Sequence, residues 1–92
     1  MPKFSPARLT AARIQAGLTQ RELAARVGRT SASHTYESGR AVPPDYMVGL
    51  LAQALGIRTV DLFEPDEADP VYRALAALDS VDGEVAMATA TA

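Results

Sequence analysis

The stretch from Leu18 to Gly39, LTQRELAARVGRTSASHTYESG, decides how the rest of the chain can fold. Thr19 suits a helix N-cap, and Glu22, three residues later, can return a hydrogen bond to the backbone N–H of Thr19, which makes a capping box. Gly28 follows an apolar run at helical spacing and suits the left-handed conformation that often ends a helix. A second helix can begin two or three residues later and must end near Gly39. The stretch therefore predicts two short helices joined by a tight turn, a helix-turn-helix.

Capping signals on both sides of this stretch predict three further helices. Ser5 can cap a helix that Gly17 ends, Pro44 can be the first residue of a helix that Gly56 ends, and Thr59 can cap a final short turn. No segment shows the alternating pattern of a strand. The chain is therefore predicted to be all-α, with a compact bundle of five helices linked by short turns.

The composition changes at Glu64, which divides the chain into residues 1–64 and residues 65–92. The second part opens with an acidic, proline-flanked linker, continues with a short helix that Asp69 can cap, and ends in a tail that is expected to fray. One side of this helix is apolar, with Leu62 and Phe63 nearby, so it is either a dimerisation surface or a face that folds back onto its own domain. The apolar positions are Val71, Tyr72, Leu75 and Leu78.

Length and composition restrict the classes of protein that fit. Ninety-two residues allow one domain with a modest core, and the absence of cysteine excludes a disulfide framework and thiolate chemistry. No apolar run has the length of a signal peptide or of a membrane span, so a cytoplasmic protein without a membrane partner is expected. Residues 1–40 carry a net charge of +5 and residues 41–92 a net charge of −7. Such asymmetry indicates one face that meets phosphates and another part that does not.

Specific residues at specific spacing make the chain similar to a known family. The segments are Gly17-Leu18-Thr19-Gln20, Glu22-Leu23-Ala24, Gly28 and Tyr36-Glu37-Ser38-Gly39-Arg40. In these segments the chain resembles the lambda-repressor-like family (Cro/C1-type, also called XRE) of helix-turn-helix domains, over roughly residues 5 to 64. The resemblance implies binding of double-stranded DNA, with the third helix in the major groove and the start of the second helix on a phosphate.

The resemblance also implies roles for individual residues. Gln20, just after the cap, is expected to contact a phosphate or a base edge, although a good helix former on an exposed turn would look the same. Arg13 and Glu37 occupy positions that pair as a buried ion bridge in several family members, which would be an architectural role. The DNA contacts that the resemblance implies are Gln20, Arg21, Arg29, Thr30, Ser31, Ser33, Thr35 and Arg40.

The third helix departs from the family pattern by one residue. The step from Gly28 to Glu37 is nine residues, where the family has ten. Ser33 stands three residues before Tyr36, where the family has an aliphatic residue that faces the core. The shorter spacing predicts an under-filled site beneath this helix, which the insertion of one isoleucine between Ser33 and His34 would fill.

The missing residue leaves two alignments of the third helix open, because one residue turns a helix face by about 100°. Aligned on the preceding turn, Ser31 and Ala32 face the groove. Aligned on the end of the helix, Thr30, Ser31 and Thr35 do. Residues 30–36 contain no Gln, Asn, Arg or Lys, so the side chains that read bases with two hydrogen bonds are absent. Weak or water-mediated specificity is expected, or specificity supplied from Arg29, Gln20 and the N-terminal arm.

Nothing in the sequence provides a catalytic mechanism, a cofactor or a metal site, because it has one histidine, no cysteine and no glycine-rich phosphate loop. The favoured hypothesis is a sequence-directed DNA-binding protein, a transcriptional regulator of the repressor type that acts as a homodimer. The alternative is an antitoxin-like or adaptor module whose altered third helix no longer reads DNA and whose acidic half binds a protein partner. Salt-dependent binding to duplex DNA discriminates between the two.

Overall fold

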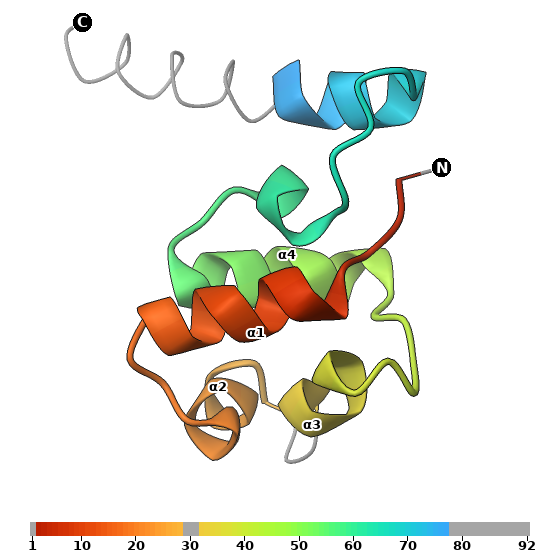
Figure 1. Cartoon of the computed structure of the whole chain (residues 1–92). Coiled ribbons are helices and arrows are strands. Elements are labelled where there is room, and N and C mark those ends of the chain that lie inside the picture. Colours follow the sequence, from red (N-terminus) through yellow and green to blue (C-terminus); the bar gives the residue numbers. More distant parts are fainter. Residues whose placement is uncertain (1, 29–31, 78–92) are drawn as a thin grey trace, which may run out of the picture.

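The computed structural model describes residues 2–28 and 32–77, and within them the regular elements are all helices joined by loops and turns. The helices α1 and α4 cross the middle of the molecule, α2 and α3 lie together below them, and a further helix at residues 70–77 lies at the opposite end (Figure 1). Apart from one isolated bridge, between Phe4 and Phe63, no extended pairing is present in the described residues. The all-α prediction is confirmed. In chain order the elements are α1 (Pro6–Gln15), α2 (Gln20–Arg26), α3 (Ala32–Glu37), α4 (Asp45–Leu55) and the 3-10 helix η1 (Thr59–Leu62).

Local capping explains where the first two helices begin. The side chain of Ser5 accepts a hydrogen bond from the backbone N–H of Arg8 at 3.2 Å, which starts α1. The predicted capping box of α2 is complete, because Thr19 Oγ1 accepts from the N–H of Glu22 at 3.0 Å and Glu22 Oε1 accepts from the N–H of Thr19 at 2.9 Å. These bonds satisfy backbone donors that a helix start leaves open.

Two of the predicted helix starts are shifted by one residue. Pro44 is the N-cap of α4, so the helix begins at Asp45. The N-cap of η1 is Arg58 and Thr59 is its first residue. The reason for the second shift is that the carboxylate of Asp61 accepts a hydrogen bond from the backbone N–H of Arg58 at 3.1 Å, so a side chain inside the turn provides the cap.

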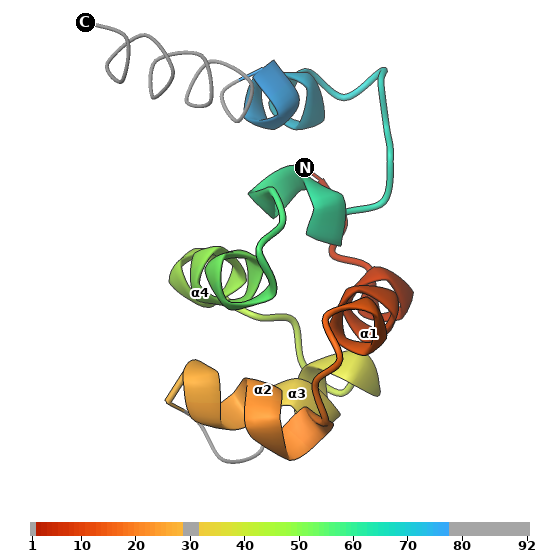
Figure 2. The same ribbon diagram turned by 90° about the vertical axis from the view of Figure 1, so that its left-hand side faces the viewer.

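The core lies between α1, α2, α4 and η1, with Tyr36 of α3 at its edge, and Figure 2 shows these helices from the side. Its fully buried large side chains are Leu9, Leu23, Met47, Leu51, Leu62 and Val60. The N-terminal arm closes the end of the core that lies away from α2 and α3, because the N–H of Ser5 donates to Leu62 at 2.9 Å and the N–H of Glu64 donates to Lys3 at 2.8 Å. The expected contribution of the arm to DNA specificity therefore does not fit this structure.

The helix at residues 70–77 lies beyond η1, and the two arrangements that the sequence left open for its apolar side both stay predictions. Asp69 caps it by accepting a hydrogen bond from the N–H of Val71 at 2.8 Å. Val71 and Leu75 line a cavity of about 360 Å³ together with Val48 of α4 and Phe63. Leu78, the fourth residue of the predicted apolar side, lies outside the described residues.

In α3, Ser33 occupies the core-facing position three residues before Tyr36. Its side chain is fully buried, and its hydroxyl donates a hydrogen bond to the carboxylate of Glu37, one helical turn later. The position that was expected to be under-filled therefore holds a small polar side chain with a partner. The nine-residue spacing is accommodated by turning a serine inward.

Insertion of an isoleucine between Ser33 and His34 is expected to destabilise the protein, contrary to what the spacing alone predicts. The insertion rotates Ser33 by about 100° relative to Glu37, which breaks their hydrogen bond, and it forces a larger side chain into the core at a cost of about 1–3 kcal/mol. Thermal unfolding followed by circular dichroism should show a melting temperature at least roughly 5 °C lower. Inserting one residue between Glu67 and Ala68, in the exposed linker, is the control. A higher melting temperature in the α3 variant would show that the site is under-filled after all.

Candidate nucleic-acid interface

A buried ion pair holds α3 against α1. Arg13, on α1, donates from Nε to Oε2 of Glu37 at 2.9 Å, and from Nη1 to the backbone carbonyl of Leu18 at 2.8 Å. The side chains of Arg13 and Glu37 are only 15% and 5% exposed. The structure thus brings together the two residues whose pairing the resemblance implied. One guanidinium group connects α1, the loop that leads into α2, and the end of α3.

The surroundings of Glu37 favour its charged form. Burial raises the pKa of this carboxyl, but the hydrogen bonds from Ser33 and Arg13, with smaller contributions from Thr10 and Gln20, outweigh the effect of burial and hold the pKa below its ordinary value. The carboxylate is therefore ionised at neutral pH. Gln20, the first residue of α2, contributes to this network as well as standing at the predicted phosphate position.

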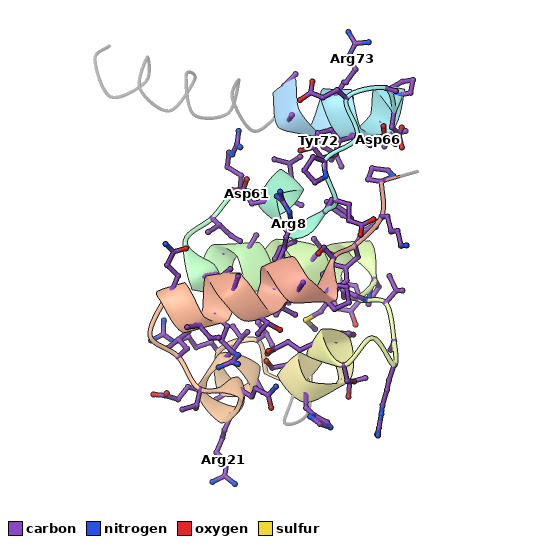
Figure 3. The ribbon with its side chains drawn as sticks, viewed as in Figure 1. Arg8, Arg21, Asp61, Asp66, Tyr72 and Arg73 are labelled. Carbon is purple, nitrogen blue, oxygen red and sulfur yellow. The ribbon has the colours of Figure 1, made fainter. Side chains whose placement is uncertain are left out.

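The predicted DNA contacts that lie in the described residues are placed at one end of the molecule. Arg21 is exposed and points away from the bundle at the α2 end (Figure 3). Gln20 and Thr35 are partly buried, and Arg40, in the loop after α3, is exposed. The other three predicted contacts in the turn, Arg29, Thr30 and Ser31, lie outside the described residues.

Ser33 is a correction to the predicted set, because its side chain has no exposed surface and its hydroxyl is bonded to Glu37. Buried residues at positions 33, 36 and 37 show that α3 follows the alignment based on its C-terminal end. In that alignment the exposed side of the helix carries His34 and the partly exposed Thr35. The sequence interpretation gave His34 no role. The sequence could have indicated that His34 is exposed, because it directly follows Ser33, which faces inward.

The positive charge of residues 1–40 is not all at this end. Lys3 Nζ lies 4.0 Å from the carboxylate of Glu64, Arg8 donates to the backbone carbonyl of Asp61 at 3.5 Å, and Arg13 is in the buried pair. Figure 3 shows Arg8 and Asp61 together at η1, away from Arg21. Of the basic residues in the first forty that the structure describes, those left for a DNA-binding face are Arg21, Arg26 and Arg40, and Arg29, outside the described residues, stays a predicted contact.

Comparison with known proteins identifies the class to which this arrangement belongs. Residues 7–65 match a family model described as a helix-turn-helix domain. The match covers more than half of the chain, and the chain belongs to this family, in agreement with the resemblance to lambda-repressor-like domains. Searches of the curated proteins and of the solved structures each gave no match.

The part of the chain that the structure describes has neither a membrane-spanning helix nor a cluster of metal-binding side chains. None of its helices has both the length and the apolar character that crossing a membrane requires. Its histidine, aspartate and glutamate side chains form no group of three or more that could hold a metal ion.

The substitution Glu37→Gln is expected to destabilise the domain at neutral pH and to flatten its response to acid. It leaves Arg13 without a charged partner, which for a largely buried pair costs about 3 kcal/mol, or roughly 12–24 °C in melting temperature. Because the pKa of Glu37 is lowered by folding, the wild type should keep this stabilisation above about pH 4.5 and lose it as the pH falls further.

Thermal unfolding between pH 7 and pH 3 checks this prediction. Glu22→Gln is the matched control, because the pKa of Glu22 is also lowered, chiefly by the backbone N–H of Thr19, but the group is fully exposed and glutamine can serve in a capping box. Equal effects of the two substitutions at pH 7 would show that the buried pair has no special role in stability.

Proposed function

We propose that this protein is a sequence-directed DNA-binding protein that regulates transcription, as a repressor, and that it binds duplex DNA as a homodimer. The observation that carries the proposal is the separation of charge along the molecule. Three exposed arginines lie on α2 and in the loop after α3, namely Arg21, Arg26 and Arg40. The acidic linker lies at the opposite end, together with the exposed Arg73, as the positions of Arg21, Asp66 and Arg73 illustrate (Figure 3). The helix-turn-helix family to which the chain belongs supports the same conclusion.

In the proposed complex, residues 1–64 form the DNA-binding unit, and α3 enters the major groove with its exposed side. His34 and Thr35 reach base edges there. Gln20, Arg21 and Arg40 contact phosphates around them, which positions the helix without reading sequence. Hydroxyl and imidazole groups discriminate between bases less strongly than arginine or asparagine side chains, which can form two hydrogen bonds to one base. The preference for one DNA sequence over another should therefore be modest.

Binding to duplex DNA is expected to weaken as salt rises, with a limited slope. Each phosphate neutralised contributes about 0.9 to the slope of log K against log salt. With four arginines left for the DNA-binding face, the slope should not exceed about 4 for each domain. Fluorescence anisotropy with labelled duplex DNA from low to moderate salt measures it. Absence of binding at low salt would contradict the proposal and favour the adaptor class.

Removing a positive charge should weaken DNA binding at the α2–α3 end of the molecule and leave it unchanged at the far end. Arg21→Ala and Arg40→Ala should each weaken binding several-fold and reduce the salt slope by about one. Arg73→Ala is the matched control, because Arg73 is exposed and points away at the far end of the molecule (Figure 3). It should leave both quantities unchanged. Equal weakening by all three substitutions would indicate non-specific attraction rather than a binding face.

A further inference from the structure

The cavity of about 360 Å³ lies between α4, η1 and the helix at residues 70–77, away from α2 and α3 (Figure 1). Its volume falls within the range of roughly 300–1,000 Å³ that is usual for small-molecule sites, whose walls are mostly apolar with a few polar groups. Val71, on one wall, is still 42% exposed, so apolar surface faces the open space. The lining includes Asp45, Val48, Gly49, Phe63, Val71 and Leu75.

The missing side chain of Gly49 keeps this space open. A Cβ atom built on Gly49 would meet no atom within 4 Å, so the residue borders open space rather than packed atoms. The residue does not have the positive φ that favours glycine elsewhere in the chain, and alanine would stabilise the helix more. Backbone geometry therefore does not require glycine at this position, whereas a larger side chain would occupy part of the cavity.

Asp45 gives the cavity its polar character. It is the first residue of α4, and no other described residue that lines the cavity carries a charge. Within the described part of the chain, its carboxylate has no hydrogen bond or ion pair. A mainly apolar cavity therefore has one carboxylate with no partner in the described residues, and such a group suits a ligand that carries a positive charge.

The charges around the cavity favour a cation as well. The acidic linker lies at the same end of the molecule, as the position of Asp66 shows (Figure 3). Lys3 and Arg58 are each paired with a carboxylate, Arg8 donates to a backbone carbonyl of η1, and Arg73 points away from the bundle (Figure 3). None of these basic residues lines the cavity. The local field should therefore attract cations and repel anions.

We propose that this cavity binds a small hydrophobic amine in its cationic form. The apolar body would lie against Val48, Phe63 and Leu75, with the ammonium group at Asp45. An apolar cavity of about 150 Å³ is enough for benzene, so the larger volume here has room for a body of two fused rings. The site is distant from the DNA-binding face, and the inference does not rest on the proposed function.

Three probes with the same naphthalene body test the preference for a cation. At neutral pH naphthylmethylamine is a cation, naphthylmethanol is uncharged and naphthoate is an anion. Heteronuclear NMR titration of the isotope-labelled full chain, without DNA, measures how tightly each binds and which residues shift. The amine should bind at least roughly fivefold more tightly than naphthoate, which is the effect of one partly exposed ion pair. Equal binding of the two, or no saturable shifts at Val48, Gly49 and Phe63 with the amine, would overturn the proposal.

Filling the cavity should remove binding. Gly49→Leu adds an apolar side chain where the described molecule leaves space, so its circular dichroism should be unchanged while the shifts caused by the amine disappear. Gln53→Leu is the matched control, because it adds the same side chain to an exposed position of α4 that does not line the cavity. It should bind the amine as the wild type does. Undiminished binding by Gly49→Leu would place the amine elsewhere and overturn the proposal.

Removing the carboxylate should change the selectivity of the cavity rather than its capacity. Asp45→Asn should still bind naphthylmethanol and should lose most of the preference for the amine over naphthoate. Asp66→Asn, in the linker and outside the cavity lining, removes the same charge and should keep that preference. An unchanged preference in Asp45→Asn would contradict the assignment of the ammonium group to this residue.

Discussion

The contact between Arg13 and Glu37 is the interaction on which the placement of the helix-turn-helix depends. An arginine on the inward side of α1 would be costly without a partner, because a buried charge must be paired and hydrogen-bonded. The carboxylate of Glu37 and the carbonyl of Leu18 provide those partners at 2.9 and 2.8 Å. Three segments that are distant in sequence are thereby fixed relative to one another. The angle at which α3 is presented follows from this pair as much as from apolar packing.

The same network explains how a shortened third helix can still be held in place. Ser33 adds a hydrogen bond to Glu37 from within α3, which an aliphatic side chain at this position could not form. A small inward residue also allows α3 to pack closely. The consequence for function is that Ser33, Tyr36 and Glu37 make up the inward side of a six-residue helix. Few positions remain on the outward side to read bases.

The sequence predicted those parts of the fold that local chemistry decides. The Ser5 cap, the Thr19 and Glu22 capping box and the glycine at the end of α4 each depend on residues within one turn, and all are present. The sequence placed Ser33 at a core-facing position of the family and also among the DNA contacts, and the second of these predictions was wrong. What the sequence could not show is the partner that makes a buried serine acceptable, because that partner, Glu37, is itself held by a residue of α1.

The candidate site was harder to predict, because charges were counted by position in the chain rather than in space. Lys3 and Arg8 belong to the basic half of the sequence, yet they lie beside Glu64 and Asp61 of the acidic half. The positive charges of these two residues thus lie away from α2 and α3, and they partly neutralise the acidic end of the molecule. What remains is a molecule in which Arg21 lies at the α2–α3 end and the acidic linker with Asp66 lies at the opposite end, where Arg73 is also found (Figure 3). In the proposed complex, the field of the phosphates would attract the α2–α3 end and repel the acidic linker, which would orient the molecule as it approaches DNA.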